Sequence, residues 1–86
     1  MDGQELMAAL LEVAERAGLE VRQAALSGEG GGVCTVRGRR ILFVDVLADT
    51  GEQLARTAAA LAELPELDGL YVVPQVRQLL DQNRGG

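Results

Sequence analysis

The sequence predicts an α+β fold in which a three-stranded antiparallel meander is covered on one face by two helices. Two long segments, residues 3–17 and 49–64, repeat apolar residues at helical spacing. Between them lie three shorter segments of apolar and β-branched residues, which are typical of strands and are separated by glycine-rich stretches. The predicted order is α-β-β-β-α-(β)-α, where the bracketed element is a short fourth strand over residues 70–73 that the pattern leaves open.

The first predicted helix covers residues 3–17 and precedes the first strand. Its apolar positions recur on one helical face at Leu6, Leu10, Val13, Ala14 and Ala17. Gly18 follows, and glycine ends helices because it takes a left-handed conformation without a Cβ clash. Residues 19–26 alternate apolar and polar side chains at their start, which predicts a strand. Residues 27–32 are mostly glycine and are expected to form a flexible loop.

The second and third strands are expected over residues 33–37 and 40–47, joined as a hairpin. Gly38 and Arg39 then form a two-residue turn, and glycine in the first position suits type II′. This turn sets a register that pairs Arg37 with Arg40, Val36 with Ile41, Thr35 with Leu42 and Cys34 with Phe43. One face of the hairpin would carry Cys34, Val36, Ile41 and Phe43, with Asp45 at its end. The other would carry Thr35, Arg37, Arg40, Leu42, Val44 and Val46.

The third strand is apolar on both faces, which is typical of a strand covered on both sides. The chain's own helices can cover one of these faces. A short chain needs something else for the other face, and we expect a second subunit, most simply a copy of the same chain. The expected contact face consists of Leu42, Val44 and Val46, with Arg37 and Arg40 beside it.

Capping and proline signals delimit the C-terminal half. Asp49 with Glu52, or Thr50 with Gln53, has the spacing of a capping box that starts the second long helix. Pro65 ends that helix near residue 64, and a turn or single-turn helix follows over residues 65–69. Pro74 begins a last helix over residues 74–82, because proline is tolerated in a first helical turn. We expect one domain over residues 1–82 and a flexible tail over 83–86.

Composition excludes several functional classes. The chain has 13 acidic and 8 basic residues, a net charge of −5, one cysteine and no histidine among 86 residues. The negative charge argues against general nucleic-acid binding. An internal disulfide needs two cysteines, and zinc sites use histidine and cysteine, so neither is expected. The apolar runs, such as residues 41–44, are far shorter than a membrane span. A lone cysteine and an acidic N-terminus favour a cytoplasmic protein.

Cys34 allows two interpretations. It is either a small buried side chain of a strand, or a reactive thiol in a thiol-based enzyme or redox sensor. Reactivity needs a neighbouring base or cation, and the chain has no histidine to act as that base.

The three arginines at the hairpin tip, Arg37, Arg39 and Arg40, also allow two interpretations. They are solvated or paired with acidic groups of a second subunit, or they contact an anion or a nucleic acid. Asp45 and Asp49 are a weak metal-site signal, and a capping or turn role is expected instead. The terminal Arg84-Gly85-Gly86 is expected to be unstructured.

The hairpin and the following segments resemble a group of small uncharacterised bacterial proteins. The resemblance rests on residues 31–45, with a G-G-x-C start, and on residues 70–77, with a Y-x-x-P-x-x-R ending. It implies no activity. A looser likeness is to the front half of ImmA/IrrE-type zinc metallopeptidases, whose second helix carries His-Glu-x-x-His. Residues 54–64 contain neither histidine, so this likeness implies a scaffold without zinc.

The residue pattern contains no catalytic, cofactor-binding or metal-binding constellation. We therefore expect a non-enzymatic module without a cofactor that binds itself, as a homodimer, or another protein.

Overall fold

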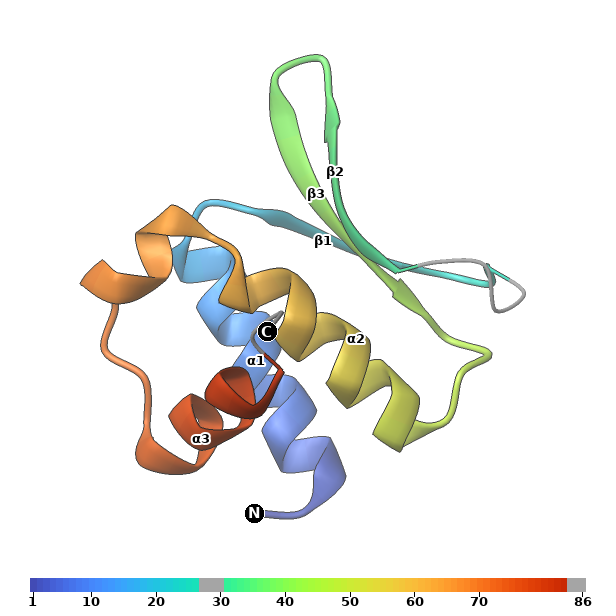
Figure 1. The fold of residues 1–86 in the computed structure, drawn as a ribbon. Helices are drawn as coiled ribbons and strands as arrows, with labels where there is room; N and C mark the ends of the chain where they lie inside the picture. The colour runs from blue at the N-terminus through green and yellow to red at the C-terminus, as the bar shows by residue number, and fades with distance from the viewer. Residues whose placement is uncertain (27–30, 84–86) are drawn as a thin grey trace.

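A computed structural model describes residues 1–26 and 31–83, with three α-helices, one 3₁₀ helix and three strands in that part of the chain (Figure 1). In chain order the elements are α1 (Gly3–Arg16), β1 (Glu20–Ala24), β2 (Gly32–Val36), β3 (Arg39–Asp45), α2 (Thr50–Ala62), η1 (Pro65–Gly69) and α3 (Pro74–Gln82). The predicted α+β class is confirmed. Residues 70–73 form no strand, because they pair with none of the three strands of the sheet; Val72 is instead buried in the core.

The helices lie close to the predicted ranges, although α2 ends at Ala62, two residues before the predicted end, and Asp49 is the one of its two candidate caps that acts. The Asp2 carboxylate accepts a hydrogen bond from the Glu5 amide at 2.8 Å, and the Asp49 carboxylate accepts one from the Glu52 amide at 2.8 Å. Each bond satisfies one of the amides that a first helical turn leaves unpaired. Gly18 has a φ of +89° after the C-cap of α1, as its position predicts.

The sheet is mixed, and the predicted antiparallel meander is wrong. Its strand order is β1-β3-β2, with β1 parallel to β3 and β2 antiparallel to β3. The central position goes to β3 because this strand alone carries a continuous apolar run, Ile41 to Val44. A meander would have put β2 in the centre, where its exposed Thr35 would need covering. The two-sided apolar pattern therefore marks a central strand.

The hairpin turn consists of Arg37 and Gly38, one residue earlier than predicted. Both residues have positive φ, 53° and 80°, as a type I′ turn requires. Val36 then pairs with Arg39 and Cys34 with Ile41, so the predicted register was wrong by two residues. Because side chains alternate with a period of two, a shift of two keeps the residues that were predicted in strands on their predicted faces, except Arg37, which lies in the turn.

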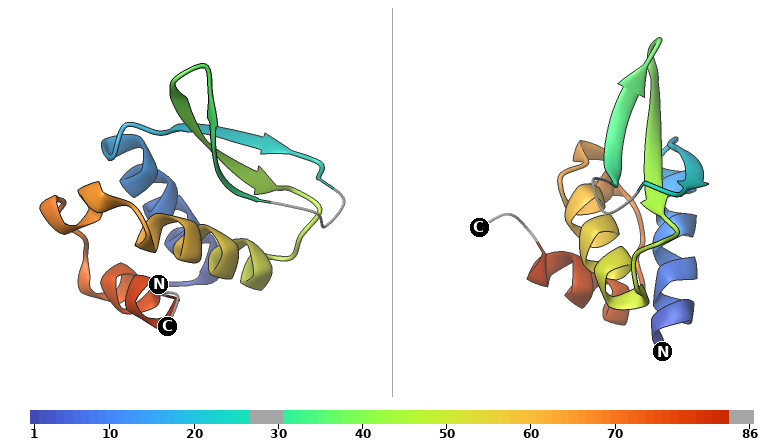
Figure 2. Two further views of the ribbon diagram at one scale, coloured as in Figure 1. Left: turned by 45° about the horizontal axis from the view of Figure 1, so that its top comes forward. Right: turned by 90° about the vertical axis from the view of Figure 1, so that its right-hand side faces the viewer.

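The helices all lie on one side of the sheet, and the outer half of the β2–β3 hairpin projects away from them (Figures 1 and 2). The core lies between helices and sheet and is formed mainly by Leu10, Val13, Leu42, Val44, Ala58, Leu61, Val76 and Leu80. Within the described residues, no helix is long and apolar enough to cross a membrane.

Candidate interaction surface on the projecting hairpin

The face of the sheet that turns away from the helices is open and partly apolar. The register places Cys34 beside Ile41 and Gly32 beside Phe43, on the same face as Val36. Ile41 lies on the central strand and is only 3% exposed, whereas Val36 near the tip is 47% exposed. On this face Ile41 is therefore covered by its neighbours, whereas Cys34 and Val36 of β2 are exposed and Phe43 of β3 is half-buried.

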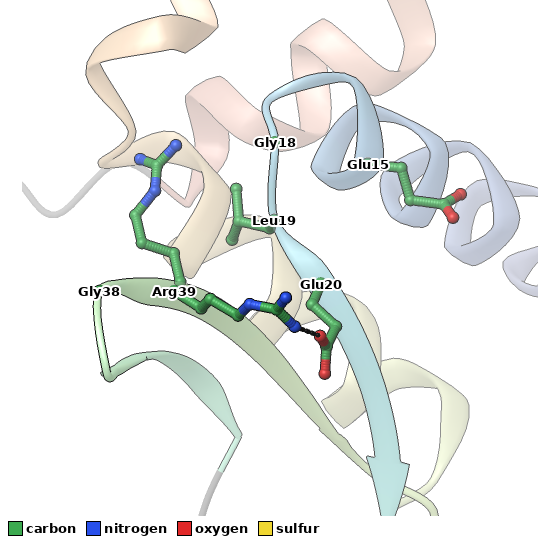
Figure 3. Close-up of a pocket in the computed structure, with 7 residues that line it drawn as sticks. Glu15, Gly18, Leu19, Glu20, Gly38 and Arg39 are labelled. Atoms are coloured by element: carbon green, nitrogen blue, oxygen red, sulfur yellow. Dashed lines mark hydrogen bonds and ion pairs between the residues drawn. The ribbon is translucent and has the colours of Figure 1, made fainter.

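On the same open face, charged side chains occupy the half that β1 contributes. Glu20 of β1 forms ion pairs with Arg22 of the same strand and with Arg39 of β3, the latter at 3.5 Å (Figure 3). Glu20 is the register partner of Ile41, so this cluster borders the apolar residues of β2 and β3. The surface thus has an ionic half on β1 and an uncharged half on β2.

Arg40 does not belong to this surface, although the sequence suggested it as a contact residue. Its guanidinium pairs with the Glu66 carboxylate through two hydrogen bonds and donates a further one, at 2.9 Å, to the Ala17 carbonyl. The hydrogen bond between Arg40 and Glu66 lowers the pKa of the Glu66 carboxyl and raises that of the Arg40 guanidinium. Arg40 faces the helices because it shares the side of β3 that carries Leu42.

The predicted contact face is mostly core. Leu42 and Val44 are buried under α1 and α2, and only Val46 is exposed, at 47%, in the turn after β3. A partner cannot reach Leu42 or Val44 without displacing the helices. The two faces of the hairpin were identified correctly from the sequence, but the helices cover the one that was expected to be free.

Cys34 is exposed, so its interpretation as a buried side chain is wrong. It lies in the middle of the edge strand β2, on the face opposite the helices. Among residues 1–26 and 31–83 its thiol has no hydrogen-bond partner. The other predicted site residue of this hairpin, Arg37, is exposed in the turn.

The aspartates near the end of β3 have structural roles. The carboxylate of buried Asp45 accepts hydrogen bonds from the amides of Leu26 and Leu47, at 3.1 and 3.0 Å, and so joins the ends of β1 and β3. Asp49 caps α2. No group of three or more metal-ligating side chains occurs in the described part of the chain.

An open hollow of about 570 Å³ lies between the hairpin tip and the end of α1 (Figure 3). Its charged lining comes from Glu15, Glu20, Arg39 and Arg40. Arg39 and Arg40 are already paired with carboxylates, and Glu15 points away from Arg39 in Figure 3. The hollow therefore carries charges of both signs, with no concentration of either sign to select a ligand.

Comparisons of the chain with protein-family models, with curated proteins and with solved structures find no match. The predicted loop over residues 27–32 falls largely outside the described residues, and the Arg84-Gly85-Gly86 ending falls wholly outside them.

Proposed function

We propose that this chain is a non-enzymatic, cytoplasmic module that binds another protein chain through the open face of its projecting hairpin. The observation that carries the proposal is the placement of exposed Cys34 and Val36, with half-buried Phe43 on the same face, on a side of the sheet that no helix covers. Contiguous exposed apolar groups on a small domain are typical of protein contacts. A neighbouring cluster of charges, centred on Glu20, gives such a face the polar rim common at interfaces.

The charges argue for a protein partner over an anion or a nucleic acid. The chain carries a net charge of −5. Of the three arginines near the tip, Arg40 pairs closely with Glu66, and Arg39, which is 78% exposed, lies 3.5 Å from the carboxylate of Glu20. Nucleic-acid contact requires free positive charge that releases counterions from phosphates, and Arg37 alone is a weak source of it.

A photo-crosslinking experiment tests the proposal. A photoreactive amino acid replaces Val36 on the open face, and a matched variant carries it at Tyr71, which is 71% exposed but lies between η1 and α3. In cells, we expect a discrete covalent protein adduct from position 36 and none of that mass from position 71. Identical adduct patterns at both positions, or no protein adduct at position 36, would contradict the proposal.

The exposure of Cys34 favours one second candidate, a thiol-based enzyme or redox sensor. An activated thiol is more nucleophilic at neutral pH than an ordinary cysteine because more of it is thiolate. A sensor therefore predicts that a disulfide reagent modifies Cys34 faster in the folded chain than in the urea-unfolded chain. If Cys34 reacts in the folded chain no faster than in the unfolded chain, the result contradicts the thiol-based enzyme or sensor.

A further inference from the structure

We propose that a second copy of this chain docks on the free edge of β2, antiparallel to it, with the two Cys34 residues facing each other across a two-fold axis. The two sheets then join into one continuous sheet. This inference rests on the proposed function and names the partner and the geometry of contact.

The two edges of the sheet differ in how they are protected. A free edge strand presents unpaired N–H and C=O groups to other chains, and charged residues or proline normally block it. The β1 edge carries the ion pair between Glu20 and Arg22. The β2 edge, Gly32–Val36, contains neither a charge nor a proline, and three of its five residues are exposed. The unprotected edge is therefore β2.

The ladder of the hairpin determines which backbone groups of β2 are free. In a two-residue hairpin the pair that flanks the turn, here Val36 and Arg39, is hydrogen-bonded, and such pairs alternate with non-hydrogen-bonded ones. Cys34 therefore turns its backbone groups toward Ile41. Val33 and Thr35 turn theirs toward the free edge, one on each side of the central residue.

This arrangement is self-complementary. When two β2 strands pair antiparallel about Cys34, Val33 of one copy lies opposite Thr35 of the other, and both bring free N–H and C=O groups. The two Cys34 residues form a non-hydrogen-bonded pair, whose Cα atoms lie roughly 4.5 Å apart. That separation falls within the range that a disulfide spans, about 4.4–6.8 Å. In a reducing compartment the thiols stay reduced, and the strand pairing needs no disulfide.

Beside the free edge of β2 there is room for the hairpin of the second copy, and an acidic side chain that can meet its arginine. An open hollow of about 530 Å³ lies beside the first half of β2, lined by Gly31, Gly32, Val33, Arg56, Ala59, Ala60 and Glu63. A Cβ placed on Gly32 would meet nothing within 4 Å. In the symmetric register, the turn of the second copy, with Arg37, comes next to the Gly31 end of β2, at the rim that carries exposed Glu63. Arg56 on the same rim already pairs with Glu52. The cationic tip of each copy thus meets an acidic group of the other.

The purified chain alone tests this inference in reducing buffer by light scattering after size exclusion. We expect twice the 9.1 kDa mass of the chain at high concentration, with concentration-dependent dissociation. Thr35→Pro should give a monomer with an unchanged far-ultraviolet spectrum, because it removes an N–H that faces the free edge. Should Thr35→Pro unfold, Arg37→Glu takes its place. It should weaken the dimer, and Arg37→Glu combined with Glu63→Arg should restore it.

Oxidation with a copper–phenanthroline catalyst tests the register. Cys34 should form the disulfide dimer rapidly. A Cys34→Ser, Val36→Cys variant should form it at least tenfold more slowly, because the two residues at position 36 lie roughly 13 Å apart along the strands. Equal rates would overturn the register. A wild-type chain that stays monomeric to roughly 100 μM would overturn the second copy as partner. The proposed function would then still stand if position 36 crosslinks a different protein in cells.

Discussion

At the residue scale, Arg40 connects three elements. It lies on β3, hydrogen-bonds the carbonyl of Ala17 at the end of α1, and pairs with Glu66 of η1. The planar guanidinium can serve all of these acceptors because its donors point in several fixed directions. Arg40 therefore stabilises the fold and is not available to a partner.

The pairing of Arg40 with Glu66 makes stability depend on pH. The hydrogen bond from Arg40 lowers the pKa of the Glu66 carboxyl in the folded chain. Stabilisation by this carboxylate is therefore present above the ordinary carboxyl pKa of about 4.3 and is lost as the pH falls through the lowered value. We expect Glu66→Gln to lower the urea midpoint at neutral pH, and the difference from wild type to shrink in strong acid.

Glu12→Gln is the matched control, because Glu12 is an exposed glutamate of α1. Its midpoint should follow the wild type across the pH range. A Glu66→Gln variant that is as stable as wild type at neutral pH would contradict the role given to the pair.

At the element scale, the hairpin turn has an unusual composition. Both turn residues have positive φ, and Gly38 takes this conformation without strain. Arg37 has a Cβ and is the only described residue other than glycine with positive φ. The type I′ turn is retained because its twist matches that of the strands it joins.

Arg37→Asn should stabilise the hairpin, because asparagine tolerates the left-handed conformation better than arginine does. We expect a gain of about 0.5–1 kcal/mol in the free energy of unfolding, measured in urea with an unchanged m-value. Arg39→Asn serves as control, since Arg39 lies outside the turn and its exposed pair with Glu20 contributes little. Equal effects of the two substitutions would argue against strain at Arg37.

At the scale of the whole molecule, the core and the projecting hairpin contribute differently to stability. The buried side chains come from the helices and the inner face of the sheet, whereas the outer half of the hairpin stands clear of them (Figure 2). Folding therefore depends on the helical layer, and the hairpin surface can change with little effect on the fold.

Leu61→Ala should destabilise the chain by about 2–5 kcal/mol, because Leu61 is fully buried where α2 meets the core. Leu47→Ala removes the same atoms from a side chain that is 65% exposed and should cost less than about 0.5 kcal/mol. Urea unfolding followed by circular dichroism measures both. Similar losses from the two variants would mean that the core is not centred on the helical layer.

Local signals in the sequence were sufficient to predict where the helices lie. Asp49 begins α2, Gly18 follows α1, and Pro74 begins α3, because each acts through its own backbone and its immediate neighbours. The same local alternation separated the two faces of the hairpin correctly, even though the turn lies one residue earlier than predicted.

The candidate surface could not be predicted in the same way. Leu42 and Cys34 both lie on strands with apolar residues, and nothing local says which of their faces the helices cover. The sequence by itself determined the class of fold, the helices and the sidedness of the hairpin, since these follow from periodicity and capping. Only the tertiary structure decided that β3 is central, that β2 is a free edge and that Cys34 is exposed. Those properties depend on contacts between segments far apart in the chain, and the free energy of burying the whole core selects among them.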